Sequence, residues 1–191
     1  MKWTAIVPLR GQGERKTRLA GRLSEEQRRR LSHQLFEHVV NVLRASPSVA
    51  RLVLLSDICP ADWQGAFTLD KGRGLNAELD ELARAIPQPP LLVIHADLPL
   101  LAVQDITVLL GEAAGGFAIA PDRAGSGTNA IALCDPSGFR FGFGPDSFSR
   151  HLRAAGSRAR VVARSGLGLD VDTSEDLDAA IALGFIAPAG C

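Results

Sequence analysis

The sequence predicts an α/β fold in which a mostly parallel sheet is flanked by helices. Three observations predict it. Short apolar runs of strand length alternate along the chain with longer stretches of helical periodicity. The run LLVI at residues 91–94 is apolar at every position, as in a strand that is buried on both faces. Two later runs, at residues 117–120 and 131–133, are close enough in sequence to form a β-hairpin inserted into the sheet.

The chain has 191 residues, of which 46% are apolar and 22% are charged, and its formal net charge is zero. These values are typical of a globular protein, and the length predicts one domain over residues 1–191. A zero net charge predicts no general attraction to nucleic acid or to a membrane surface. The sequence leaves the oligomeric state open, with a homodimer among the options.

The three cysteines, Cys59, Cys134 and Cys191, share no CxxC or Cys/His spacing. They therefore predict neither a disulfide framework nor a zinc site. The apolar run after Lys2 is broken by Pro8, which leaves it too short for the core of a signal peptide, and no later stretch has membrane-spanning length. We therefore expect a cytoplasmic protein.

Asp97 stands just beyond the apolar run at residues 91–94, and Pro99 follows it. Because proline cannot donate to a sheet ladder, the acid is expected at the carboxyl end of this strand. Open α/β sheets bind ligands outside the carboxyl ends of their strands, so Asp97 predicts a site for a metal ion or a phosphate. The alternative is that Asp97 only caps the helix expected near residues 103–111.

A basic loop, RGQGERKTR, occupies residues 10–18 after the strand expected at residues 4–9. Its two glycines would allow the backbone to approach an anion closely, and its four cationic side chains could neutralise several phosphate charges. The loop matches neither GxGxxG nor the P-loop pattern, so a solvated charged turn is the alternative to a phosphate-binding loop.

Ser24 and Gln27 form the pattern of a capping box, which predicts the start of a long helix through residue 44. His33 and His38 lie in this helix. Neither has an obvious partner at position i+4, which favours surface or packing roles over metal ligation.

The segment DKGRGLN at residues 70–76 leads into a helix expected at residues 77–86. Gly74 and Asn76, in a turn at a helix start, could offer backbone amides and a side-chain amide to a base or a ribose. As the alternative, Asn76 is the helix cap. Between the strand expected at residues 52–55 and this segment, we expect only an irregular connection.

Small polar residues fill the loop at residues 121–129, between the two strands of the predicted hairpin. In the segment FGPDS, Gly144 and Ser147 precede a helix expected at residues 148–155. Backbone amides there, with Ser147 as the cap, would make an anion site. His151 lies near this site, but the sequence shows no nucleophile and no orienting acid, which argues against a hydrolase triad.

The acidic segment LDVDTSEDL at residues 169–177 precedes the last predicted helix. Thr173 with Asp176 predicts the cap of that helix. Asp170 and Asp172 alternate with apolar residues, a spacing that places both carboxylates on the same side of an extended strand.

The order of these motifs resembles that of a known enzyme family. The chain carries in sequence the basic loop, GLN, DLP, PDRAGSGTNAIAL, FGPDSFSRH and LDVDTSEDL. Over about residues 4–183 these motifs are similar to those of the guanylyltransferases that act on 2-phospho-L-lactate, phosphoenolpyruvate or 3-phosphoglycerate in the biosynthesis of the deazaflavin coenzyme F-420. That family is related to the molybdenum-cofactor guanylyltransferases. The loop at residues 11–15 departs from the family's Pro-containing segment before the Lys.

The resemblance implies a single-domain, Rossmann-like mononucleotide-binding fold of the nucleotide-diphospho-sugar transferase type. It implies a nucleotidyltransferase that uses GTP and Mg2+, transfers GMP to the phosphate of a small phosphorylated acid, and releases pyrophosphate. By position, Asp97 and Asp172 match the metal carboxylates, and Lys16 matches the catalytic basic residue on the triphosphate. The positions that match the acceptor-binding residues are Thr128, Gly144 and Ser147. The candidates for nucleotide binding are Leu9, Arg10, Gly11, Lys16, Gly74 and Asn76.

The sequence does not specify the acceptor acid, and two other functions stay open. A molybdenum-cofactor or sugar-phosphate nucleotidyltransferase would use the same two acids, but it would need a wider acceptor pocket than the donors between Thr128 and Ser147 suggest. A nucleotide-binding module without catalysis is the other, and the presence of Asp97, Asp172 and Lys16 counts against it.

Overall fold

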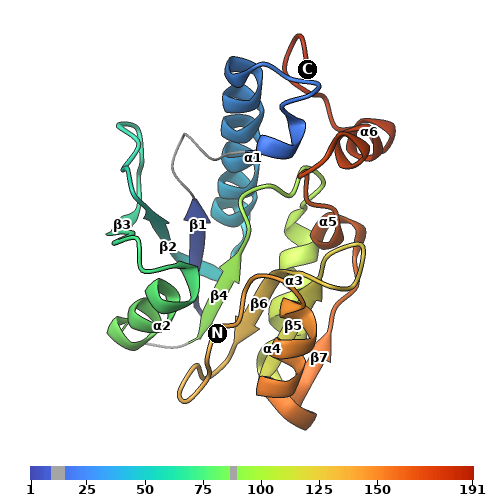
Figure 1. Cartoon of the computed structure of the whole chain (residues 1–191). Helices are drawn as coiled ribbons and strands as arrows, with labels where there is room; N and C mark the ends of the chain where they lie inside the picture. The colour runs from blue at the N-terminus through green and yellow to red at the C-terminus, as the bar shows by residue number, and fades with distance from the viewer. Residues whose placement is uncertain (10–15, 87–89) are drawn as a thin grey trace.

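The computed structural model describes residues 1–9, 16–86 and 90–191. Its centre is a seven-stranded sheet with the strand order β3-β2-β1-β4-β6-β5-β7 (Figure 1). The strands of the parallel half are β1 (Trp3–Leu9), β2 (Val49–Ser56), β3 (Ala66–Leu69) and β4 (Leu91–Ile94). Parallel strands place their carboxyl ends at one edge, which is where open α/β sheets bind ligands.

The other half of the sheet contains the predicted hairpin. β5 (Phe117–Pro121) and β6 (Thr128–Leu133) pair antiparallel, and β6 also pairs antiparallel with β4. β7 (Ala159–Val161) lies parallel to β5 at the far edge. Because β6 runs against β4, the start of β6 lies beside the carboxyl end of β4, where the backbone N–H of His95 donates to Asn129 O at 2.9 Å. The mostly parallel sheet with a hairpin insertion is therefore confirmed.

Helices cover both faces of this sheet (Figure 1). The α-helices are α1 (Glu25–Ala45), α2 (Leu75–Ala85), α3 (Val103–Glu112), α4 (Ser147–Ala155), α5 (Ser165–Gly168) and α6 (Ser174–Ala182). Short 3-10 turns are η2 (Thr17–Leu19), η3 (Ala113–Gly115) and η4 (Gly156–Arg158). α1 and α3 pack on one face of the sheet, and α2 and α4 pack on the other.

β4 alternates between the two apolar cores on either side of the sheet. Leu92 and Ile94 pack in the core under α1 and α3, whereas Leu91 and Val93 pack in the core on the opposite face. All four side chains are fully buried. Burial of apolar surface contributes about 25 cal/mol per Å2, so a strand covered on both faces is stabilised by an apolar residue at every position. This explains the unbroken LLVI run.

A third apolar core joins the end of the chain to the start of α1. Leu177 of α6 and Val171 before it are fully buried against Leu31 and Leu35 of α1. Leu19 of η2 lies in the same core. This packing brings the segment after the first loop and the acidic segment before α6 to the same place.

Two of the predicted helix starts are confirmed. Ser24 and Gln27 form a reciprocal capping box at the start of α1, and Thr173 and Asp176 form one at the start of α6. Both satisfy backbone N–H groups that have no partner within the helix.

The starts of α2 and α4 differ from the prediction, because Asn76 and Ser147 lie inside the first turn of their helices and do not cap them. The residues before these helices have positive φ angles, 93° at Gly74 and 55° at Asp146. The chain therefore turns sharply into each helix through a residue of positive φ, without a side-chain cap. The conformation at Gly74, with a ψ of 145°, is one that essentially only glycine adopts.

Two further expectations were wrong, and one alternative is excluded. The connection expected to be irregular contains β3, an edge strand whose half-buried residues give only a weak pattern. The segment that carries Asp170 and Asp172 pairs with no described strand, and it follows the unpredicted α5. The excluded alternative is that Asp97 only caps α3, because that helix begins after Ala102.

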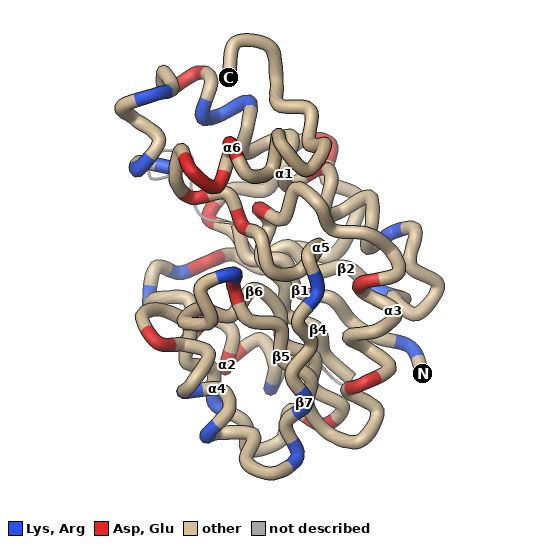
Figure 2. Tube along the Cα trace, turned by 90° about the vertical axis from the view of Figure 1, so that its right-hand side faces the viewer, with Lys and Arg blue, Asp and Glu red and all other residues tan. Residues whose placement is uncertain are grey.

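No helix in the described part of the chain is long and apolar enough to cross a membrane. Lys and Arg are interspersed with Asp and Glu along the trace, with no single-sign face in the view of Figure 2. This distribution agrees with the formal net charge of zero.

Candidate active site

Three carboxylates meet at the carboxyl end of β4, and we call Asp97, Asp170 and Asp172 the carboxylate cluster. One oxygen of each lies within 4.8 Å of the others. Asp97 follows β4, and the other two lie between α5 and α6. The alternation of Asp170 and Asp172 with apolar residues therefore does place both carboxylates on one side, although no strand forms.

Backbone and side-chain hydrogen bonds fix this arrangement. The backbone N–H of Val171 donates to Asp97 O at 3.1 Å, which joins the two acidic segments directly. Leu98 and Val171 beside them are fully buried. From β6, the Asn129 amide donates to Asp170 Oδ1 at 3.1 Å and also to Leu167 O and Gly168 O. Asn129 therefore holds the segment that carries Asp170.

Lys16 bridges two of the carboxylates. Its Nζ donates to Asp97 Oδ2 at 2.6 Å and to Asp172 Oδ1 at 3.0 Å, and its side chain is only 7% exposed. Burial alone would lower the pKa of Lys16, but the two carboxylates outweigh it and hold that pKa above its usual value. Burial alone would raise the pKa of Asp97, but the Lys16 ammonium outweighs it and holds that pKa below its usual value. The three residues predicted as catalytic therefore lie together, and the shifted pKa values of Lys16 and Asp97 favour the charged form of both.

The donor set suits a divalent cation with oxygen ligands. Three carboxylates face one ammonium, so the cluster keeps an excess of negative charge when all are ionised. Asp97 Oδ1 is buried and has no hydrogen-bond partner among the described residues. Burial, followed by the charge of Asp97, raises the pKa of Asp170, which is the response expected of crowded carboxylates. Mg2+ prefers this kind of carboxylate ligand, so the residues present fit such an ion.

The tip of the hairpin is closed by Asp122. Its carboxylate accepts hydrogen bonds from the backbone N–H groups of Ser126 at 2.9 Å and Gly127 at 2.8 Å. A side chain at position 127 would place a β-carbon 2.6 Å from Asp122 Oδ2, so a residue larger than glycine would displace this carboxylate. The N–H of Phe148 in α4 donates to Ser126 O at 3.1 Å, which joins this tip to the FGPDS segment.

The predicted acceptor-binding residues lie in these two joined segments. Thr128 and Ser147 are 1% and 2% exposed, whereas Gly144 is exposed and has a φ of 114°. The backbone N–H of Ser147 donates to Gly144 O at 3.1 Å. The backbone N–H groups of Ser147 and Phe148 thus already have acceptors within the protein. Fewer free N–H groups are therefore available to an anion at this helix start than the sequence predicted.

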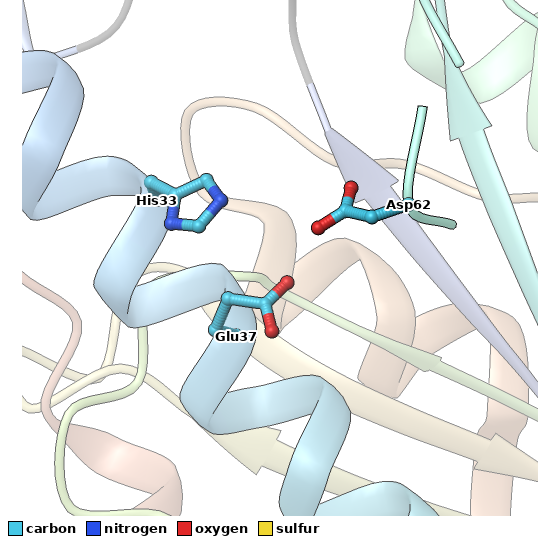
Figure 3. Close-up of side chains that lie close together, drawn as sticks. All are labelled: His33, Glu37 and Asp62. Atoms are coloured by element: carbon cyan, nitrogen blue, oxygen red, sulfur yellow. The ribbon is translucent and has the colours of Figure 1, made fainter. Parts of the chain in front are cut away.

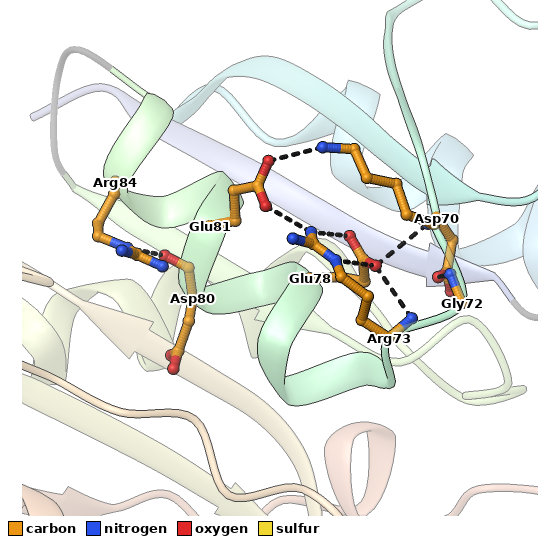
Figure 4. Close-up of polar contacts among 8 residues, drawn as sticks. Asp70, Gly72, Arg73, Glu78, Asp80, Glu81 and Arg84 are labelled. Carbon is orange, nitrogen blue, oxygen red and sulfur yellow. Dashed lines mark hydrogen bonds and ion pairs between the residues drawn. The ribbon is translucent and has the colours of Figure 1, made fainter.

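Glu78 of α2 organises the loop that contains Gly74 (Figure 4). Its side chain is 2% exposed, and it accepts from the Lys71 backbone N–H at 3.1 Å and from the Arg73 guanidinium at 2.7 and 3.0 Å. Hydrogen bonds from Arg73 lower the pKa of Glu78 to about 2. Glu81, one turn later, pairs with the same guanidinium at 2.5 Å. The loop is therefore held by charge-assisted hydrogen bonds.

The other predicted nucleotide-binding residues have different surroundings. Asn76 accepts from Phe143 N at 2.7 Å and donates to Phe143 O at 3.0 Å, so its amide ties α2 to the FGPDS segment. Leu9, at the end of β1, is half-buried and lines a small pocket of about 110 Å3. Arg10 and Gly11 lie outside the described residues.

A second cluster lies on α1, where His33 and Glu37 point toward Asp62 (Figure 3), with ligand atoms within 4.8 Å of one another. The prediction that His33 has no partner at position i+4 is therefore wrong, because Glu37 occupies that position. His33 and Asp62 are exposed. His38 Nε2 lies 2.9 Å from Leu101 O, which confirms a packing role for His38.

Comparison with known proteins adds the family to this geometry. Over residues 3–185 the chain matches the family described as guanylyl transferase CofC like. The chain belongs to this family. A CofC-like guanylyl transferase is a nucleotidyltransferase enzyme, and the meeting of Lys16 with Asp97 and Asp172 is consistent with that chemistry.

Relatives of this CofC-like protein cover almost its whole length. It is 37% identical to a phosphoenolpyruvate guanylyltransferase of Sphaerobacter thermophilus, over 93% of this chain and 92% of that protein. It is 38% identical to a phosphoenolpyruvate guanylyltransferase of Rubrobacter xylanophilus, over 91% of this chain and 90% of the relative.

Solved structures confirm the Rossmann-like fold of the nucleotide-diphospho-sugar transferase type. A protein of Desulfovibrio desulfuricans G20, described as a nucleotide-diphospho-sugar transferase, superposes with a TM-score of 0.73 at 18% identity, over 93% of this chain and 86% of that one. The 2-C-methyl-D-erythritol 4-phosphate cytidylyltransferase of Thermus thermophilus gives a TM-score of 0.63 at 16% identity, over 97% of this chain and 100% of that one.

Sequence reasoning about the CofC-like protein missed three structural roles. Asn129 holds Asp170, Glu78 holds the glycine loop, and His151 contacts Thr128. Only Glu78 could have been found from the local sequence. It is an acid in the first turn of α2, four residues after Gly74, which forms the turn into that helix. The other two contacts join segments that are far apart in sequence.

Proposed function

We propose that this protein transfers GMP from GTP to the phosphate of phosphoenolpyruvate and releases pyrophosphate, as a step in the biosynthesis of the deazaflavin coenzyme F-420. The observation that carries the proposal is the meeting of Asp97, Asp172 and Lys16 at the carboxyl end of β4, in a member of this family. The names of the relatives favour phosphoenolpyruvate over 2-phospho-L-lactate and 3-phosphoglycerate.

In the proposed reaction, an oxygen of the acceptor phosphate attacks the α-phosphorus of GTP. The bond from this phosphorus to the oxygen that bridges to the β-phosphate breaks, and pyrophosphate leaves with that oxygen. The acceptor phosphate has a second pKa of about 6, so it is mostly ionised at neutral pH and needs no general base. The protein's tasks are to position two anionic substrates and to offset their charge.

Lys16 is proposed to offset charge on the triphosphate. Its ammonium carries three donors and now bridges Asp97 and Asp172, so it lies where a triphosphate would meet the carboxylate cluster. Transfer of these hydrogen bonds from carboxylates to phosphate oxygens keeps the ammonium paired throughout.

Asp97 and Asp172 are proposed to hold Mg2+, with Asp170 beside them. The support is the unpartnered Asp97 Oδ1 and the excess of carboxylates over ammonium groups. When bound, Mg2+ would neutralise phosphate charge and act as a Lewis acid. The residues of this chain orient that site, because Asn129 and the Val171 backbone fix the positions of the carboxylates.

Thr128, Gly144 and Ser147 are proposed to bind the phosphorylated acid. The support is that two donors with little exposure, Thr128 and Ser147, flank a sharp glycine turn in joined segments. Hydroxyl donors to a charged oxygen stabilise binding by about 1.5 to 3 kcal/mol each.

For the nucleotide, Leu9, Gly74 and Asn76 are the proposed contacts among the described residues, and Arg10 and Gly11 stay predictions from sequence. Asn76 can contribute only through a second N–H, since Phe143 already engages both ends of its amide. We expect GTP to be preferred over ATP, because guanine presents an N1–H and an amino donor edge that adenine lacks.

The test is to incubate the protein with GTP, Mg2+ and each of the three phosphorylated acids separately, and to identify the products by mass. The expected result is pyrophosphate and a GMP adduct of phosphoenolpyruvate. A sugar 1-phosphate serves as the control for the competing nucleotidyltransferase reaction. An adduct with the sugar phosphate, or no adduct with any acid, would overturn the proposal.

A further inference from the structure

His151 is fully buried on the inner face of α4, although it is titratable and the proposed reaction does not use it. Its ring joins three segments. Nδ1 lies 2.9 Å from Thr128 Oγ1 at the start of β6, and Nε2 lies 2.9 Å from the backbone N of Gly142. Phe143 packs edge-on against the ring at 4.8 Å, and Phe139 stacks on it at 6.0 Å. The ring is therefore fixed in position and in orientation.

These contacts decide which ring nitrogen carries the proton. A backbone N–H can only donate, so Nε2 of His151 must accept from Gly142 and carry no hydrogen. Burial first, and then the charges of Arg150 and His95, lower the pKa of His151 to about 4, so the ring is neutral at pH 7. A neutral ring has one N–H, which must be on Nδ1.

The same reasoning orients the Thr128 hydroxyl. Because Nδ1–H donates to Thr128 Oγ1, the hydroxyl proton must point away from the ring. No described residue accepts this proton, although Thr128 is only 1% exposed. A buried donor without an acceptor is costly, so this arrangement favours a ligand that supplies one.

We propose that His151 is a positioning residue, whose Nδ1–H fixes the Thr128 hydroxyl as a hydrogen-bond donor to an anionic oxygen of the phosphorylated acid. The inference rests on the proposed function, since it takes the Thr128 site to bind that acid. His151 touches neither the acid nor the reacting atoms. It acts through Thr128. Because Nδ1 carries the proton, the Thr128 hydroxyl accepts from His151 and is left to donate its own proton to the acid.

A merely structural role would differ in its consequences. If His151 only joined the hairpin to α4, its replacement would lower stability and would affect both substrates alike. A positioning role instead raises the KM for the acid and leaves the KM for GTP unchanged.

Two substitutions separate the two ring nitrogens. In His151→Asn the side-chain amide can replace Nδ1–H toward Thr128, whereas in His151→Gln the amide oxygen can replace Nε2 toward Gly142. We expect His151→Gln to raise the KM for phosphoenolpyruvate about tenfold or more, a factor typical of one hydrogen bond to a charged group. We expect the KM of His151→Asn for phosphoenolpyruvate to stay within about threefold of the wild-type value. Arg153→Gln, an exposed position on the same helix, is the matched control.

A measurement on the wild-type protein keeps the inference testable if a variant does not fold. The 15N spectrum of labelled histidine should show His151 with Nδ1 protonated and Nε2 unprotonated at pH 7. A proton on Nε2, or equal acid KM values in folded His151→Asn and His151→Gln, would overturn the inference. Wild-type turnover with phosphoenolpyruvate tests the proposed function separately, because the spectrum does not depend on it.

Discussion

The carboxylate cluster and the pair Thr128–His151 lie on opposite sides of the start of β6 and are built in opposite ways. The cluster is ionic and partly exposed, with Asp97 and Asp172 side chains 24% and 49% exposed. The Thr128–His151 pair is neutral and almost completely buried. The ionic contacts can be exchanged for a cation and phosphates, whereas the neutral pair is already set before a ligand arrives. We therefore expect the proposed substrates to rearrange the ionic part on binding and to leave the neutral pair unchanged.

β6 connects the two parts. Thr128 and Asn129 are consecutive residues at an irregularity in the pairing of β6 with β5, and their side chains contact different parts of the molecule. The first contacts His151, and the second donates to Asp170. A shift of this strand by one residue would remove both contacts together.

The largest expected effect is on the ionic part. Asp97→Asn and Asp172→Asn should each lower turnover on the order of a hundredfold or more, because each removes a charged ligand from the cluster. Both variants should still fold, because both side chains lie at the rim of the sheet. The measurement is pyrophosphate release at saturating Mg2+.

Asp178→Asn is the control for these variants, because that carboxylate is 65% exposed and pairs only with Arg22 among the described residues. It should keep wild-type turnover. Near-normal turnover in Asp97→Asn would show that the ionic part is not the catalytic one.

A smaller effect is expected from the loop that Glu78 organises. Glu78→Gln keeps the shape of the side chain but removes the charge that holds Arg73 and the Lys71 backbone, so the loop should loosen. We expect the KM for GTP to rise about threefold to tenfold, with the KM for phosphoenolpyruvate unchanged. Glu81→Gln, at a half-exposed position, should have a weaker effect. If the KM for the acid rose as much as the KM for GTP, the loop would have no specific role in nucleotide binding.

The last effect, on stability and not on activity, is a pH dependence from the neutral part. The pKa of His151 is lowered to about 4 in the folded protein, whereas an ordinary histidine titrates near 6.5. Protonation therefore favours the unfolded chain, so this contribution is complete above about pH 6.5 and is lost as the pH falls toward about 4. We expect a loss of roughly 1 kcal/mol per pH unit in that window.

Melting temperatures of the wild type and His151→Asn, measured between about pH 7.5 and 4.5, check this dependence. The melting temperature of the variant should depend less on pH. Each kcal/mol of difference in unfolding free energy corresponds to about 2 to 4 °C in melting temperature. Asp170, whose pKa is raised, acts in the opposite direction but is present in both proteins, so the difference isolates His151. Parallel profiles would show that His151 is not held neutral.

The sequence predicted the features whose causes are local. β4 occupies the residues expected, because an apolar run of that length is the pattern of a strand buried on both faces. The capping boxes at Ser24 and Thr173 were found because their partners lie three residues away. β3 was missed because an edge strand has half-buried residues and gives no clear alternation.

The candidate site residues were singled out from the sequence, but their contacts with one another were not. Asp97 and Lys16 were singled out by position, yet their hydrogen bond spans 81 residues. The contact between His151 and Thr128 spans 23 residues, and the one between Asn76 and Phe143 spans 67. Such contacts depend on the final packing of the sheet and helices, which no spacing within one segment encodes.

The central claim is that the two parts of the site bind two different substrates, and calorimetry on two variants tests it most directly. Phosphoenolpyruvate and GTP with Mg2+ are titrated separately into Thr128→Val and Asp172→Asn. We predict that Thr128→Val weakens binding of the acid by about tenfold or more and leaves GTP within about twofold, with the reverse pattern in Asp172→Asn. Equal losses for both substrates in either variant, or no loss of acid affinity in Thr128→Val, would contradict the account.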